Sequence, residues 1–228
     1  ENRIAACLAG YADRPGNAPC MFGADETRAL FTALDAARFA IHVHVIGDAA
    51  ARRAIEGLEA ALAANARWPA QHQLAHLQLV DPGDYARLAR VATANIQPLW
   101  ARLDPAIPDI ALDMIGPARQ ADTYAFRKML EAGADWCLSS DWPVSTLNPF
   151  EIIETAVTRQ ARRGDGPKTP FLPDQRLTVE EAVMGYTTHA ARACWREGWT
   201  GQLRPGFSGD LIVLDRGGFS CPADAIFD

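Results

Sequence analysis

The sequence has no long apolar run, no cysteine pattern and no excess of basic residues. No stretch approaches the roughly 18–20 apolar residues that a membrane-spanning helix needs, so no membrane partner is expected. The five cysteines are scattered without a CxxC pair, which favours reduced thiols and a cytoplasmic location. The formal net charge of −6 over 228 residues argues against nucleic acid as a partner, because phosphate binding needs clustered Lys and Arg.

Several catalytic motifs are absent as well. The sequence holds no G-x-G-x-x-G fingerprint and no Walker loop, which disfavours nucleotide enzymes of the Rossmann and P-loop types. It also lacks the G-x-S-x-G elbow of serine hydrolases. The one basic cluster, Arg159 to Arg163, ends a helical pattern and is expected to stay solvated at the helix C-terminus.

Strand and helix patterns alternate along most of the chain. Short runs rich in apolar and β-branched residues predict strands over residues 40–46, 73–77, 92–97, 135–139 and 209–215. Helical patterns lie over residues 25–37, 48–68, 81–88, 118–132 and 149–162, and a capping box starts another at Thr178. The first four strands alternate with helices, which predicts parallel strands joined by right-handed crossovers. Half of an eight-fold barrel and an open doubly wound sheet both fit this pattern.

Polar residues stand at the ends of these strands, where parallel α/β folds collect their ligands. His44 lies near the end of the first strand, His76 near the end of the second, and Asp141 just past the fourth. The third strand ends with Gln97 instead.

Each of these residues also has an ordinary structural interpretation. A single His in an apolar strand is more often a hydrogen-bonded core residue, and Asp141 after two serines could cap a helix. Three residues with unrelated structural roles would not be expected at the same end of successive strands. Their common position therefore favours a shared site. Two imidazoles and a carboxylate suit a divalent ion such as zinc, and the carboxylate could take a proton from attacking water.

The other histidines admit different interpretations. His42 shares a strand face with His44, so the two could form a ligand pair, or His42 could be hydrogen-bonded one layer deeper. His72 precedes the second strand and is expected to be exposed, and His189 in a helical stretch is expected to be structural.

Seven segments resemble the amidohydrolase superfamily in their order and spacing. The resemblance is to family 3, in the branch that contains N-substituted formamide deformylase. The segments are HVIGDAA at 44–50, AHLQ at 75–78, NIQP at 95–98, GPAR at 116–119, SDWP at 140–143, YTTHAA at 186–191, and GQLRPG at 201–206 followed by DLIVL at 210–214.

This resemblance implies an α/β fold that is part of a TIM (β/α)8 barrel, about strands 5–8 with their helices, over residues 1–200. A remnant of a small β-sandwich would occupy residues 201–228. His44, His76 and Asp141 would be metal ligands, most simply of zinc, and Asp141 would also be the catalytic general base. Gln78, Gln97 and Trp142 would bind the substrate.

The sequence departs from the family pattern in two respects. The His-x-His pair of strand one and the bridging ligand of strand four are not present, and the chain begins with Glu1 rather than Met. We therefore expect a truncated, inactive part of an enzyme that hydrolyses an amide or other C–N bond of a small molecule. The alternative is a non-catalytic α/β binding or assembly module, in which the exposed strand edges of two copies pair as a homo-oligomer.

Overall fold

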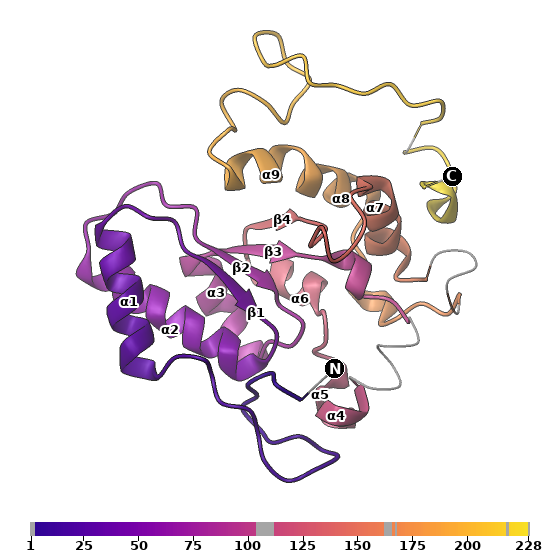
Figure 1. Ribbon diagram of the computed structural model, residues 1–228. Coiled ribbons are helices and arrows are strands. Elements are labelled where there is room, and N and C mark those ends of the chain that lie inside the picture. Colours follow the sequence, from indigo (N-terminus) through magenta and orange to yellow (C-terminus); the bar gives the residue numbers. More distant parts are fainter. Residues whose placement is uncertain (1–2, 104–111, 162–165, 167, 218, 228) are drawn as a thin grey trace. The chain divides into compact units, whose positions relative to one another are not determined.

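The computed structural model describes residues 3–103, 112–161, 166, 168–217 and 219–227, and it alternates helices with short strands (Figure 1). The strands are β1 (His42–Val45), β2 (Gln73–His76), β3 (Thr93–Ile96) and β4 (Trp136–Leu138). They form one sheet in the order β1-β2-β3-β4, with β1 parallel to β2. The first four predicted strands are therefore confirmed, each shorter than its apolar run.

The helices account for most of the regular structure. They are α1 (Ala24–Ala36), α2 (Asp48–Ala64), α3 (Tyr85–Val91), α4 (Asp113–Ile115), α5 (Pro117–Gln120), α6 (Phe126–Glu131), α7 (Pro149–Thr158), α8 (Val179–Tyr186) and α9 (Thr188–Ala193). Single 3-10 turns lie at Pro82–Asp84, Pro98–Trp100, Pro173–Gln175 and Ala223–Ala225. None of the helices in the described ranges is long and apolar enough to cross a membrane.

The chain divides into two compact units. The first comprises Glu1–Asn95 and Pro105–Asp135, and the second comprises Ile96–Asp104 and Trp136–Asp228. His44 and His76 belong to the first unit, and Asp141 belongs to the second.

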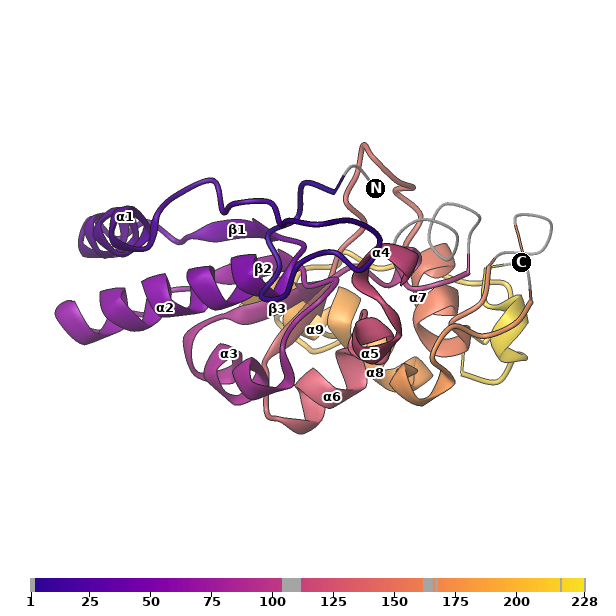
Figure 2. The same cartoon turned by 90° about the horizontal axis from the view of Figure 1, so that it is seen from below.

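In the first unit α1 and α2 lie side by side (Figure 2). One face of α2 is buried. It carries Ile55, Leu58 and several alanines at helical spacing. Gly57 permits the close approach of α1, because a Cβ at this position would lie 2.7 Å from the ring of Phe31. The hydrophobic pattern of the sequence thus produces a two-helix layer that packs through a small residue.

In the second unit the capping box predicted at Thr178 is confirmed. The Thr178 hydroxyl accepts a hydrogen bond from the Glu181 amide at 3.1 Å, and the Glu181 carboxylate accepts one from the Thr178 amide at 2.7 Å. The helix α8 that follows packs on β4, where Gly185 lies against Leu138.

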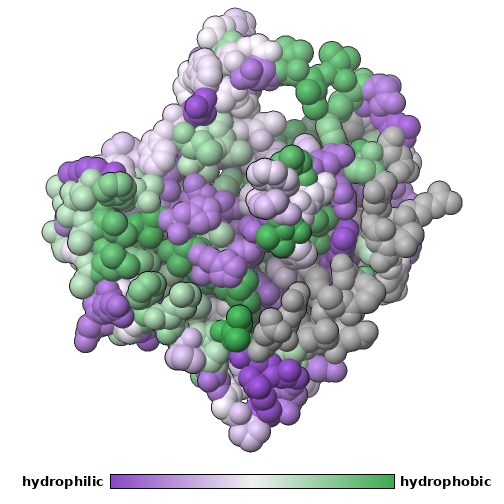
Figure 3. Space-filling view, viewed as in Figure 1, coloured by the Kyte–Doolittle hydropathy of each residue, from purple (hydrophilic) through white to green (hydrophobic). Residues whose placement is uncertain are grey.

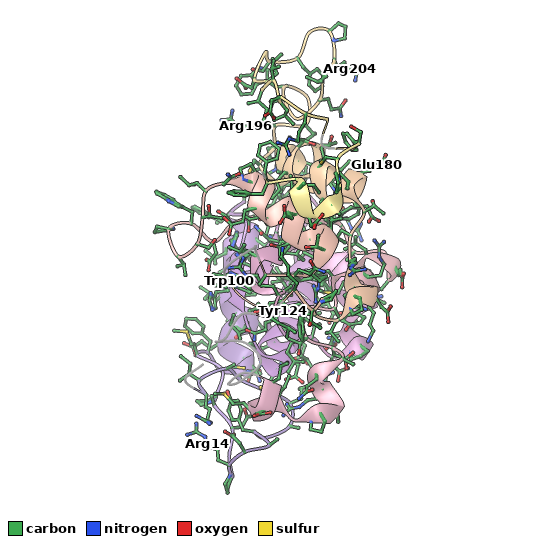
Figure 4. The ribbon with its side chains drawn as sticks, turned by 90° about the vertical axis from the view of Figure 1, so that its right-hand side faces the viewer. Arg14, Trp100, Tyr124, Glu180, Arg196 and Arg204 are labelled. Atoms are coloured by element: carbon green, nitrogen blue, oxygen red, sulfur yellow. The ribbon has the colours of Figure 1, made fainter. Side chains whose placement is uncertain are left out.

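The single helix predicted over residues 118–132 is wrong, because it is split into α5 and α6. Tyr124, between them, has a left-handed backbone with φ of 48°, and its amide donates to the carbonyl of Gln78 at 2.7 Å. Thr123 also forms an isolated antiparallel bridge with Leu79. These backbone contacts hold the buried Tyr124 inside the first unit (Figure 4) and outweigh local helix propensity.

The strand predicted over residues 209–215 is also wrong. These residues are irregular, and apolar side chains along the segment lie at the surface (Figure 3). Val213 among them is 90% exposed. Within the described ranges the segment has no strand beside it. A strand forms only where its backbone groups pair with those of another strand. An apolar sequence alone therefore does not make residues 209–215 a strand. Arg204 (labelled in Figure 4) lies just before this segment. Its guanidinium lies over the ring of Phe207.

Arg159 does not stay solvated, as was expected of the basic cluster. It is fully buried and left-handed, with φ of 57°, and its Nε donates to the carbonyl of Phe171 at 2.8 Å. The side chain therefore ties the end of α7 to a later loop. Arg162 and Arg163 lie outside the described residues.

Candidate metal and substrate site

The structure brings His44 and His76 together at the ends of two neighbouring strands. The register pairs His44 with Ala75 and Val45 with His76. The centroids of the two imidazole rings lie 4.1 Å apart, with the ring planes at 63°. His76 is 9% exposed, whereas His44 is exposed on the edge strand β1. Parallel strands thus place two residues that are far apart in sequence in direct contact.

The chain after His76 has an unusual backbone. His76 and Leu77 both have positive φ angles, 72° and 51°. This left-handed region costs an L-residue roughly 1–2 kcal/mol. The Leu77 amide donates to the carbonyl of Val45 at 3.0 Å, which holds the end of β2 against β1.

Asp141 follows β4 in the second unit. Its backbone is left-handed, with φ of 65°, and its carbonyl accepts a hydrogen bond from the Val144 amide at 2.8 Å. The carboxylate is half-buried and makes no hydrogen bond or ion pair with the residues that the structure describes. Trp142, next to it, is 60% exposed.

The two histidines have the chemistry of a metal site. Among the described residues no group of three His, Cys, Asp or Glu side chains is arranged to hold a metal ion. Imidazole suits zinc and similar divalent ions, and both rings could approach one ion. A pair of imidazoles in contact is therefore compatible with zinc.

Gln78 lines a cavity of about 590 Å³ that His44 also lines, and both residues belong to the first unit. Gln97, in the second unit, is 4% exposed, and its Oε1 has no hydrogen-bond partner among the described residues. A buried acceptor without a partner is uncommon in proteins. Gln78 and Gln97 thus both hold polar groups that the described protein leaves available.

His42 lies exposed on the same strand as His44. No hydrogen bond to its ring is present among the described residues, so the interior hydrogen bond that the sequence suggested is not formed here. Partial burial nevertheless lowers the pKa of His42 below its ordinary value. A ligand pair of His42 and His44 remains an alternative.

His72 is buried, not exposed as the sequence suggested. Its Nδ1 accepts a hydrogen bond from the Ile41 amide at 3.1 Å, so the ring proton resides on Nε2. Nε2 lies 3.2 Å from the carboxylate of Asp35, which also accepts from Trp68 at 2.6 Å and from Asn65 at 2.8 Å. This cluster joins the starts of β1 and β2 to α1.

The N-terminal segment is a further part of the site that the sequence did not indicate. The Ala6 carbonyl accepts hydrogen bonds from the amides of Ala49 and Ala50, and Asp48 accepts one from the Leu8 amide at 2.8 Å. Arg119 donates to the carbonyls of Ala9, Gly10 and Ile115. Asp48 and Arg119 therefore fix this segment at the end of β1. The sequence did not predict this role because the segment has no helix or strand periodicity.

The parallel strands, the histidine pair at their ends and the adjoining cavity define an α/β protein with a candidate ligand site. The family model described as "Amidohydrolase family" matches residues 1–228. The chain belongs to amidohydrolase family 3, which confirms the resemblance seen in its motifs.

Two curated relatives are similar to this chain, and each is considerably longer than it. The protein LONG AFTER FAR-RED 3 of Arabidopsis thaliana is 31% identical over 207 residues, 90% of this chain and 34% of that protein. N-substituted formamide deformylase of Arthrobacter pascens is 38% identical over 98 residues, 43% of this chain and 17% of that enzyme. The chain thus spans about a third or less of the length of these two relatives.

A solved structure shares the fold. An uncharacterized metal-dependent hydrolase from Pyrococcus horikoshii matches with a TM-score of 0.81 at 23% identity, over 98% of this chain and 44% of that one. The α/β architecture with parallel strands is therefore that of part of an amidohydrolase fold.

Proposed function

We propose that the protein to which this chain belongs is a metal-dependent hydrolase that cleaves an amide or another C–N bond of a small molecule. The contact between His44 and His76 at the ends of adjacent parallel strands carries this proposal. Membership of the amidohydrolase family supports it. Nucleic acid and membrane are not proposed as partners, and a cytoplasmic location is proposed from the scattered cysteines.

The proposed metal ligands are His44, His76 and Asp141, and the proposed ion is zinc. When bound, a divalent ion would acidify a water molecule and polarise the carbonyl of the substrate. The two imidazoles would act as neutral nitrogen donors.

Asp141 is the proposed general base. Its carboxylate would accept the proton of the attacking water and return it to the leaving nitrogen, so that the amine departs uncharged. The absence of an ion pair on Asp141 within the described ranges supports this role, since the carboxylate is not engaged elsewhere. Gln78, Gln97 and Trp142 are the proposed substrate-binding residues, with the amide groups of the two glutamines as hydrogen-bonding partners.

We further propose that residues 1–200 form part of a (β/α)8 barrel and that residues 201–228 form part of a small β-sandwich. The likeness to a longer metal-dependent hydrolase supports the first assignment. The exposed apolar segment around Val213 supports the second, because it would pair with strands of the intact protein. The 228-residue chain by itself is proposed to be inactive.

The experiment is hydrolysis of a panel of N-formyl and N-acyl amines by the full-length protein, with and without a chelator. Asp141→Asn should lower kcat by about 10²–10⁴-fold, as expected on removal of a general base. Asp174→Asn, the same change at an exposed position of the second unit, should leave kcat unchanged. Activity that survives both chelation and Asp141→Asn would exclude this mechanism.

A non-catalytic binding or assembly module is the second candidate. The exposed apolar side chains around Val213, which an assembly partner could cover, favour it. A full-length protein that retains no metal and hydrolyses no member of the panel would support this alternative.

A further inference from the structure

The cavity beside His44 lies entirely within the first unit. Its volume of about 590 Å³ falls inside the range of roughly 300–1,000 Å³ that small-molecule sites occupy. Four parts of the chain enclose it: the N-terminal segment, the β1–α2 junction, the residues just after β2, and the region from α4 to Thr123.

The wall of this cavity is mainly apolar. Ile46, Ala50, Leu79, Met114 and Ile115 contribute apolar side chains to it. Leu79 and Met114 belong to a buried cluster with Cys7 and Tyr11, which also line the cavity. Such a wall favours an apolar ligand group, because binding would remove the apolar surfaces of both the ligand and the wall from water.

No unpaired charge faces this cavity among its described lining residues. Its one guanidinium, Arg3, is ion-paired with Asp13. Burial raises the pKa of the Cys7 thiol and of the Tyr11 phenol, so both groups are neutral at pH 7. The Tyr11 hydroxyl donates to the Ala5 carbonyl at 2.6 Å and is already satisfied. An ionic ligand group would therefore lose its hydration without gaining a counter-charge.

Two polar groups on the wall are available to a ligand. Thr123 is 1% exposed, and its Oγ1 has no hydrogen-bond partner among the described residues. A buried hydroxyl in this state is rare and is satisfied when a ligand or water supplies a partner. The side-chain amide of Gln78 likewise makes no hydrogen bond within the described chain, and it lines the same cavity.

From these observations we infer that the cavity is a specificity subsite for an uncharged aryl or alkyl substituent of the substrate. Thr123 and Gln78 hydrogen-bond to the polar atoms of the substrate that adjoin that substituent, such as its amide. His44 lies where the cavity meets the histidine pair. The identity of the occupant as substrate rests on the proposed function, whereas the preference for a neutral apolar group rests on the cavity alone.

Ala50 offers a direct test of the occupant. It lies in the first turn of α2 and lines the cavity, so a leucine there would fill ligand space without lowering helix propensity much. Ala63→Leu is the matched control, since Ala63 is exposed on the same helix and does not line the cavity. Thr123→Val keeps the shape of the side chain and removes its hydroxyl.

The measurement is calorimetric binding of N-(2-phenylethyl)acetamide to the chelator-treated full-length protein, where no turnover occurs. N-methylacetamide and the 4-carboxy derivative of the same probe serve as small and charged comparisons. We expect both comparison ligands to bind at least tenfold more weakly. Ala50→Leu should weaken binding of the phenylethyl probe about tenfold and Thr123→Val roughly fivefold, with Ala63→Leu within twofold of wild type. Circular dichroism establishes that each variant is folded.

Equal binding of the three ligands by the wild-type protein would overturn the inference, whether or not the variants fold. Equal binding of the phenylethyl probe by folded Ala50→Leu and wild-type protein would also overturn it. Tight, selective binding without hydrolysis in the metal-loaded protein would leave the subsite intact and reject the proposed function. Hydrolysis without any preference for the apolar substituent would support the proposed function and reject the subsite.

Discussion

Asp35 receives three hydrogen bonds in the interior of the first unit, from Trp68, Asn65 and His72. Burial by itself would raise the pKa of Asp35, but these hydrogen bonds and the nearby His72 hold it below its ordinary value. Hydrogen bonds to a buried carboxylate are stronger than those between neutral groups. The residue thus links α1 to the connection between α2 and β2.

Asp35→Asn should therefore destabilise the protein. The amide presents donors where the carboxylate accepted, and we expect a loss of about 2 kcal/mol in the free energy of unfolding. Urea denaturation measures this loss. Asp25→Asn, in the first turn of the same helix and almost fully exposed, should change the unfolding free energy by a few tenths of a kcal/mol. Equal effects of the two changes would contradict the role of Asp35.

His72 should make stability depend on pH. Burial lowers its pKa below the ordinary value of about 6.5, and the Asp35 carboxylate offsets this only in part. Because the unfolded chain binds the proton more readily, stability is fully present above about pH 6.5 and falls as the pH drops below it. Urea midpoints between pH 7.5 and 5 should show this decline. His72→Asn should reduce the decline.

His42 also has a lowered pKa, so His42→Asn measures its separate contribution to the same decline. A pH dependence that is undiminished in His72→Asn would show that His72 is not the group responsible.

Among single residues, the sequence was most informative where topology restricted the outcome. His44 and His76 were predicted to meet because parallel strands end at one edge, and they are in ring contact. His72 was placed wrongly at the surface, since its burial depends on Asp35, Asn65 and Trp68, contacts that no local pattern encodes.

At the scale of elements, the junction between β1 and α2 positions both His44 and the cavity. Gly47 is the N-cap of α2, and a Cβ on this residue would overlap the carbonyl oxygen of Ala6. The N-terminal segment can approach α2 because position 47 has no side chain.

Gly47→Ala should therefore displace that segment and distort the cavity. We expect it to lower the free energy of unfolding by about 2–3 kcal/mol, measured by thermal or urea denaturation. Gly198→Ala, where an added Cβ would meet nothing within 4 Å, is the matched control and should stay within about 0.5 kcal/mol. If both variants were as stable as the wild type, the close approach at Gly47 would be refuted.

Elements with local signals were predicted well, and those decided by distant partners were not. The first four strands and the Thr178 capping box follow from periodicity and cap chemistry. The split between α5 and α6 arises from hydrogen bonding of Tyr124 to Gln78, and the segment around Val213 lacks a strand to pair with in the described chain. Both outcomes depend on contacts that are far away in sequence.

At the scale of the whole molecule, the proposed ligands come from both compact units. His44 and His76 belong to the first and Asp141 to the second. The chain covers only 34% of the length of its Arabidopsis relative, so the complete site is a property to be measured on the full-length protein. Homo-oligomer formation through the edge of β1 is a further prediction, which sedimentation velocity of the 228-residue chain would test.

The most direct test of the central claim is the zinc affinity of the full-length protein and its single His→Asn variants, measured by competition with a chromogenic chelator. His44→Asn and His76→Asn should each weaken zinc binding by roughly 100-fold or more, because each removes a direct ligand. His42→Asn should bind zinc as the wild type does, which would also exclude the His42–His44 ligand pair. Undiminished zinc affinity in either His44→Asn or His76→Asn would contradict the shared metal site.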